Sequence, residues 1–265
     1  MSKIKKTITL TQLTVLIVIL LNLLWACQTT DSAHKKQADS LRNLGEAFLR
    51  QGDFNAALRT LLEAQRYSPK DAYIQNNMGL AYLAKKRPDL AIGHFKKATN
   101  FKSQYPDALN NLGIAYLENK QYLKAIDCFN STLKDLIYGT PHIPLANLGR
   151  SYYAIKEYDK AISNYEKSIE FSPDFAIAHR GLGQVYNAKQ DYSNAISSLK
   201  NAVRIAPRFA EAHFELAQIF VTLKQNKNAV LHYNQAIRYS QNSSFKKNVQ
   251  KYLDKIQPFE MDYRF

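Results

Sequence analysis

The feature that most constrains the fold of this chain is a small residue that returns about every 34 positions. An aromatic residue follows each member of the series three positions later, and an alanine follows it twelve positions later. The series is Gly45, Gly79, Gly113, Gly149, Gly183 and Ala217, with one step of 36 after Gly113 and steps of 34 elsewhere. A period of this length is typical of a solenoid built from stacked units.

Within each unit the apolar residues recur at intervals of three and four, which indicates two helices separated by a short polar turn. Small residues such as Gly113 and Ala125 allow the two helices to lie close together. Aromatic residues such as Tyr116 and Phe129 are expected to fill the space between neighbouring hairpins. A bulky residue at Gly113 is therefore expected to overpack its hairpin.

These signature positions resemble those of tetratricopeptide repeat proteins over residues 38–243. The resemblance implies an all-α fold, a right-handed superhelical solenoid of six helix hairpins. The expected repeats are 38–71, 72–105, 106–141, 142–175, 176–209 and 210–243. The last segment, 244–265, begins with a basic amphipathic pattern and is expected to form a capping helix and a tail, which would cover the final open face of the stack.

The N-terminus has the pattern of an export signal. Three lysines precede an apolar run from Leu13 to Leu24, which is short for a membrane span. The run ends in Leu-Trp-Ala-Cys, which resembles the lipobox of bacterial lipoproteins, although Trp25 departs from the usual small or aliphatic residue. The resemblance implies a signal peptide over 1–26, lipidation of Cys27 and a polar linker over 27–37. The alternatives are a simple cleaved signal peptide and an uncleaved membrane anchor.

The resemblance also bears on location, because residue 28 is Gln rather than Asp. By the sorting rules of enterobacterial lipoproteins, this predicts an outer-membrane protein that faces the periplasm. Several acyl chains anchor a protein firmly, since each buried methylene contributes about 0.8 kcal/mol. The repeats would then be tethered to the membrane rather than embedded in it.

The first helices of stacked hairpins are expected to line a groove that binds a protein or peptide segment. Amides at the sixth repeat position can donate to and accept from a peptide backbone, although asparagine is also common there in this family. An apolar strip and arginines from the same face complete the candidate site. The candidates are Asn43, Asn77, Asn111, Asn147, Leu80, Leu83, Ile114, Leu117, Arg42, Arg150 and Arg180.

No motif in the sequence predicts catalysis, a cofactor or a metal site. His179 and His213 lie 34 residues apart and could stack, but they lack further ligands at metal-binding spacing and are interpreted as packing residues. The Gly181–Gly183 stretch does not continue as a dinucleotide fingerprint. We therefore expect neither an enzyme nor a small-molecule substrate.

The chain is basic, with 36 Lys and Arg against 22 Asp and Glu. Because an exported protein rarely meets nucleic acid, we expect no nucleic-acid partner. Anionic lipid, a cell-wall polymer or an acidic protein face are alternatives, as is a simple solvated surface.

A narrower resemblance concerns the pilotins of type IV pilus biogenesis, often called PilF or PilW. Two stretches carry it, YPDALNNLG over 105–113 and LIYGTPHIPLANLG over 136–149. The family implies a role in the outer-membrane localisation and multimer assembly of secretin subunits. The alternative is a general envelope adaptor lipoprotein that recruits cell-wall hydrolases or proteases.

Overall fold

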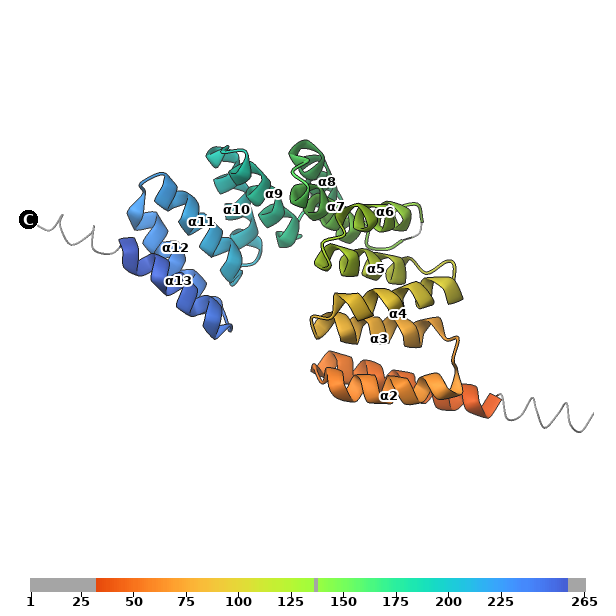
Figure 1. The fold of residues 1–265 in the computed structure, drawn as a ribbon. Helices are drawn as coiled ribbons and strands as arrows, with labels where there is room; N and C mark the ends of the chain where they lie inside the picture. Colours follow the sequence, from red (N-terminus) through yellow and green to blue (C-terminus); the bar gives the residue numbers. More distant parts are fainter. Residues whose placement is uncertain (1–31, 136–137, 257–265) are drawn as a thin grey trace, which may run out of the picture. The chain divides into compact units, whose positions relative to one another are not determined.

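The computed structural model describes residues 32–135 and 138–256, and these residues form thirteen helices and no strands (Figure 1). The first helix covers residues 32–51. The others are α2 Phe54–Tyr67, α3 Ala72–Ala84, α4 Pro88–Phe101, α5 Pro106–Glu118, α6 Tyr122–Thr132, α7 His142–Ala154, α8 Tyr158–Phe171, α9 Ala176–Ala188, α10 Tyr192–Ile205, α11 Ala210–Thr222, α12 Asn226–Tyr239 and α13 Ser243–Ile256. The predicted all-α class is confirmed.

The chain divides into two compact units, Met1–Ala108 and Leu109–Phe265. The N-terminal unit holds the first helix and α2 to α4, and the C-terminal unit holds α6 to α13. Helix α5 crosses the boundary between them. Each unit has its own core, with Leu61, Ile74 and Met78 buried in the first and Leu199, Leu216 and Val249 in the second.

The first helix begins at residue 32, so the last six residues of the expected linker are helical. The stretch contains Ala, Lys and Gln, which have good helix propensity, and this local preference extends the helix without an apolar period. The predicted signal peptide, Cys27 and the segment 257–265 lie outside the described residues. Lipidation therefore stays a prediction.

The repeated glycines lie under large side chains of the same hairpin. A Cβ atom at Gly79 would lie 2.5 Å from Cε1 of Phe95, and one at Gly113 would lie 2.5 Å from Cε1 of Phe129. Phe129 therefore packs inside its own hairpin, whereas the sequence predicted a place between hairpins. This close fit is the reason why any side chain at these glycines would overpack the structure.

Tyr165 shows that the same repeat position can also join two hairpins. Its ring lies where a Cβ atom of Gly149 would be, within the α7–α8 hairpin, and also where a Cβ atom of Gly181 on α9 would be. Both glycines are needed to make room for the one ring.

The turn inside each hairpin contains one residue with a positive φ. In the first hairpin this residue is Gly52, with φ of 80°. The equivalent residues in later hairpins are Lys86, Lys120, Lys156, Gln190 and Lys224, with φ between 58° and 64°. In the third hairpin the Lys120 amide donates to the Leu117 carbonyl (3.0 Å) and the next amide donates to the Tyr116 carbonyl (2.8 Å). These hydrogen bonds end the first helix of the hairpin as a Schellman motif, which usually has glycine at the left-handed position.

Helix α13 packs against α12 and buries Val249, Leu253 and Ile256 on one face. Its opposite face is polar, as expected for an element that ends a stack of repeats. Among the described residues, no helix combines the length and the apolar character needed to cross a bilayer.

Candidate partner-binding site

The predicted asparagines of the N-terminal unit have different environments. Asn43 is exposed, whereas Asn77 is buried and its Nδ2 donates to Oε1 of Glu46 at 2.8 Å. Asn77 is therefore bound within the protein, and Asn43 is the one of these two predicted amides that is exposed to solvent. A partner would contact Asn43 directly and could bind Asn77 only by replacing its hydrogen bond to Glu46.

Charged and aromatic side chains surround these amides. The Arg42 guanidinium lies 2.8 Å from Oδ1 of Asp39 and 3.5 Å from Oδ2 of Asp71. It also lies 5.4 Å from the centroid of the Tyr73 ring. The predicted pairing of Arg42 with an acidic partner thus competes with carboxylates of the chain itself.

Lys102 fills a gap between two tyrosines of the same unit. Its Nζ lies 4.7 Å from the Tyr73 centroid and 5.0 Å from the Tyr105 centroid, and it donates to the Tyr73 hydroxyl at 2.6 Å. Burial raises the pKa of the Tyr105 hydroxyl above its usual value. The tyrosine therefore remains neutral, and the cation is held by the rings and the Tyr73 hydroxyl.

The C-terminal unit continues the asparagine series only in part. Asn111 and Asn147 are half-buried. At the next two equivalent positions the chain has Gly181, which Tyr165 covers, and Glu215, which is bound to other side chains. Amides therefore occupy this position in the hairpins that begin this unit and are absent from the last two described hairpins.

Both predicted arginines of this unit pair with carboxylates one repeat away. Arg150 Nη2 lies 2.8 Å from Oε1 of Glu118. Arg180 Nε donates to Oε1 of Glu215 at 3.0 Å, and Gln184 Nε2 donates to the same oxygen at 2.7 Å. Opposite charges 32 and 35 residues apart are visible in the sequence, and a search at the repeat spacing would have found these pairs.

The Glu215 carboxyl group is more buried than the arginine with which it pairs. Burial raises its pKa, while the hydrogen bond and charge of Arg180 oppose that shift. Its second oxygen, Oε2, is buried and has no hydrogen-bond partner among the described residues. The Arg180 charge is therefore largely neutralised by Glu215. Arg150 is about half exposed, so it is the arginine better placed to contact a partner.

The predicted apolar strip is only partly accessible. Leu80, Leu83 and Ile114 are half-buried. Leu117 is 5% exposed, so it belongs to the core rather than to a surface strip. The pattern of a single repeat does not show which of its apolar positions the packed structure covers.

The histidines form internal contacts. His213 stacks on His232, with ring centroids 5.3 Å apart, rather than on His179 as the sequence suggested. Nε2 of His213 lies 3.0 Å from the Pro207 carbonyl, and its Nδ1 lies 3.0 Å from Nδ1 of His232. With Nε2 donating to the carbonyl, Nδ1 of neutral His213 accepts a hydrogen bond from His232. Burial and the neighbouring His213 lower the pKa of His232 to about 4.

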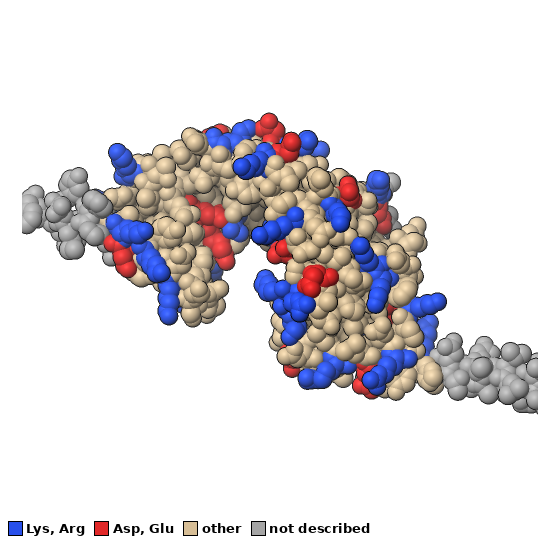
Figure 2. Space-filling view, in the orientation of Figure 1, with Lys and Arg blue, Asp and Glu red and all other residues tan. Residues whose placement is uncertain are grey.

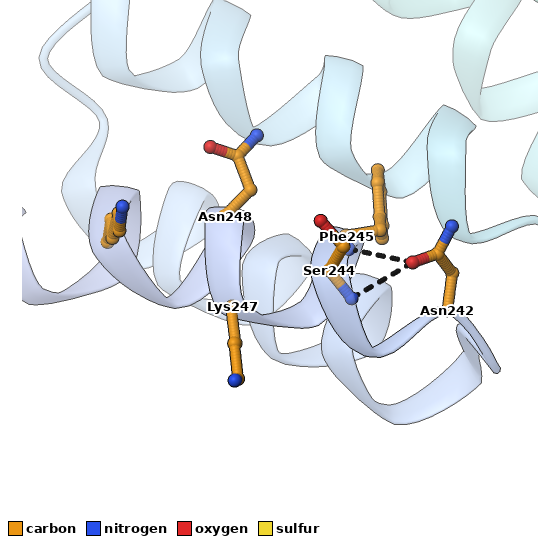
Figure 3. Close-up of a pocket in the computed structure, with 6 residues that line it drawn as sticks. Asn242, Ser244, Phe245, Lys247 and Asn248 are labelled. Atoms are coloured by element: carbon orange, nitrogen blue, oxygen red, sulfur yellow. Dashed lines mark hydrogen bonds between the residues drawn. The ribbon is translucent and has the colours of Figure 1, made fainter.

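A cavity of about 480 Å³ lies beside the start of α13 (Figure 3). Asn242 Oδ1 accepts hydrogen bonds from the backbone amides of Ser244 (2.9 Å) and Phe245 (3.1 Å), so this side chain caps the helix. Lys247 and Asn248 point to opposite sides of α13. The lining does not converge on one point, and we assign no ligand to it. Over residues 32–135 and 138–256, no group of three or more potential ligand side chains could hold a metal ion.

The chain matches family models of two descriptions along most of the described residues. Models of the tetratricopeptide repeat match residues 42–106, 106–133 and 210–243, and models of the TPR repeat match residues 149–188 and 183–224. The chain therefore belongs to the tetratricopeptide repeat proteins, which are generally non-catalytic scaffolds for protein–protein interaction. No curated protein matches the sequence.

Among solved structures, the chain resembles PilF of Pseudomonas aeruginosa and PilW, described as a widely conserved type IV pilus biogenesis factor. The match to PilF has 19% identity, covers 83% of this chain and 99% of that one, and has a TM-score of 0.67. The match to PilW has 19% identity, covers 80% of this chain and 98% of that one, and has a TM-score of 0.72. A tetratricopeptide repeat protein from Parabacteroides merdae matches with 18% identity, 91% and 94% coverage and a TM-score of 0.70. At these identities the likeness shows a shared fold.

Proposed function

We propose that this protein is a membrane-tethered, non-catalytic scaffold that assists the localisation and assembly of type IV pilus secretins. The observation that carries the proposal is the match to PilF and PilW over nearly their whole length, 99% and 98%. The sequence adds a lipobox-like segment ending at Cys27, which would tether the repeats to the outer membrane on its periplasmic side.

The partner would be a polypeptide segment that contacts the amides and arginines of the first helices. In the N-terminal unit Asn43 is exposed, and in the C-terminal unit Asn147 and Arg150 reach solvent, so each unit offers its own residues to a partner. Amide side chains provide both a donor and an acceptor to a peptide backbone, which suits an extended segment. Secretin subunits are the proposed source of that segment.

The first experiment tests the tether. Cys27→Ser is expected to abolish acyl labelling and to release the protein from membranes, while Cys128→Ser, at a buried thiol, should leave acylation unchanged. Membrane attachment that survives Cys27→Ser would contradict lipidation and leave an uncleaved anchor.

The second experiment tests the scaffold role. The double variant Asn43→Ala/Asn147→Ala is expected to weaken capture of secretin subunits in crosslinking pull-downs while the helical circular dichroism spectrum is unchanged. Asn130→Ala, at an exposed position of α6, serves as the matched control. Full capture by the double variant would remove these amides from the site.

A gene deletion separates the two adaptor hypotheses. Loss of the protein is expected to reduce secretin multimers and pilus assembly. If both remain normal, the pilotin role is wrong, and the general envelope adaptor that recruits hydrolases or proteases becomes the better hypothesis.

A further inference from the structure

The turns inside the hairpins of the C-terminal unit form one edge of that unit. Lys189, in the α9–α10 turn, places its Nζ 2.6 Å from Oδ1 of Asp159 at the start of α8. This contact links one turn to the neighbouring hairpin at the same end of the helices. We call the four turn segments 118–124, 154–160, 188–194 and 222–228 the lysine edge.

The lysine edge carries more positive than negative charge. Its four segments hold seven basic and four acidic side chains. Glu118, Glu157 and Asp159 are paired with arginine or lysine side chains. In contrast, the described residues that connect successive hairpins at the opposite edge hold balanced charges, namely Lys134, Asp135, Asp174 and Arg208.

Three lysines of this edge share one repeat position and are open to an external partner, as the exposed Lys227 also is. Lys120, Lys156 and Lys224 are exposed, and none forms an ion pair with a described residue. All three occupy the left-handed turn position, with φ of 59°, 64° and 58°. Glycine adopts this conformation without strain, as Gly52 does in the first hairpin, so lysine is an unfavourable choice for the turn itself. Lysine occupies this position in three of the four turns of the edge, with Gln190 in the fourth, and a strained residue of one charge at most of the equivalent places points to a use for that charge.

We propose that the lysine edge of the C-terminal unit binds the anionic headgroups of a lipid bilayer. The lysines stand on exposed turns rather than in a groove, where an extended anionic surface can approach them. Lysine is a compact charge on a flexible stem and does not have the planar fork with which arginine recognises individual phosphates or carboxylates, which suits a diffuse layer of headgroups.

The proposal rests on the proposed tether, because a chain held at a membrane meets that surface at high effective concentration. Each lysine near an anionic surface is expected to strengthen the contact about 5-fold, and the three together about 100-fold. The contact should also weaken with salt, because surface charges are screened beyond about 10 Å at 0.1 M ionic strength. Figure 2 shows that Lys and Arg are spread over both units, so the test must separate this edge from general attraction.

The experiment measures lysine acetylation by mass spectrometry on the full chain mixed with vesicles. One set contains phosphatidylcholine alone, and the other contains about one third phosphatidylglycerol, which gives the vesicle surface a negative potential like that of a biological membrane. Phosphatidylglycerol is expected to slow the modification of Lys120, Lys156 and Lys224 severalfold, and about 0.5 M NaCl should reverse the effect. Lys134, on the opposite edge, should react at the same rate in both sets.

Two triple variants with equal net charge provide the control. Lys120→Gln/Lys156→Gln/Lys224→Gln is expected to abolish the slowing at the reporters Lys124 and Lys160. The variant Lys134→Gln/Arg204→Gln/Arg208→Gln, which changes exposed residues near the opposite ends of the helices, should retain it. Equal loss in both variants, or equal protection of Lys134, would show general attraction and overturn the proposal.

A soluble polyanion distinguishes the source of the negative charge. Polyphosphate is added to phosphatidylcholine vesicles at the same total negative charge as the phosphatidylglycerol. It should not slow the acetylation of Lys120, Lys156 and Lys224. If it does, the edge is a site for soluble polyanions and the bilayer assignment is wrong. The tether is tested separately with the Cys27→Ser protein. This variant is expected not to stay bound to phosphatidylcholine vesicles, while its lysine edge should still be protected from acetylation by phosphatidylglycerol vesicles.

Discussion

The two units use the same repeat but fill its polar positions differently. In the N-terminal unit Gln75 Oε1 lies 2.9 Å from Nδ1 of His94, and the equivalent pair in the C-terminal unit is His213 with His232. The buried asparagine of the first unit donates to Glu46, whereas the second unit has Glu215 at the equivalent place of a later hairpin. The apolar frame is thus set by the repeat, and the polar positions are free to differ between hairpins.

The largest expected effect comes from overpacking the shared frame. Gly79→Leu should destabilise the N-terminal unit by about 3 kcal/mol, because its side chain would occupy the place of the Phe95 ring. Urea unfolding followed by circular dichroism measures the change. Gly93→Ala is the control, since a Cβ atom there meets nothing within 4 Å, and this variant should be more stable by about 0.5–1 kcal/mol. A Gly79→Leu protein of unchanged stability would show that the frame is looser than the structure indicates.

A smaller effect is expected from the ion pair found in the C-terminal unit. Arg180→Met should cost about 2 kcal/mol, less than the roughly 3–5 kcal/mol of a fully buried pair, because Glu215 would be left unpaired while partly shielded from water. The control is Arg87→Met in the N-terminal unit, where both partners are about half exposed and the loss should lie within about 0.5 kcal/mol. Equal effects in the two variants would remove the contrast between the units.

The last contrast concerns pH and the two imidazoles. The pKa of His232 is about 4 in the folded protein against an ordinary value of 6.5, so the unfolded chain binds the proton first as pH falls. This stability contribution is fully present above pH 6.5 and is lost as pH falls toward about 4. Thermal unfolding of the wild type should therefore shift to lower temperature across this window.

The matched variant is His213→Gln, which reproduces the Gln–His pair of the N-terminal unit. It removes the neighbouring imidazole that lowers the pKa of His232, so the acid-dependent loss should become smaller. Lys200 also lowers that pKa and Tyr239 packs on His213, and both remain in the variant. His34→Gln, at an exposed position, should leave the pH profile unchanged. An identical profile for His213→Gln would show that the pair does not control the effect.

The sequence predicted the helices well because each hairpin repeats the same apolar spacing, so every copy supports the others. It did not predict the start of the first helix at residue 32, because that segment is helical by propensity and carries no apolar period. The pairing of Arg180 with Glu215 was also missed, because the arginines were assigned to an external partner without a search for carboxylates about one repeat away, which would have found Glu215. The left-handed lysines were hidden because glycine, the usual signal for that conformation, occurs there only at Gly52.

The position of Tyr165 limits how this chain can be rebuilt. Its ring needs glycine on both the helix before it and the helix after it, at Gly149 and Gly181. In a design that deletes, duplicates or exchanges repeats, many hairpins could be moved singly, but α7, α8 and α9 have to be kept together as one segment. Separating these three helices would either remove the Tyr165 ring and leave a cavity, or place the ring against a helix that lacks the glycine it needs.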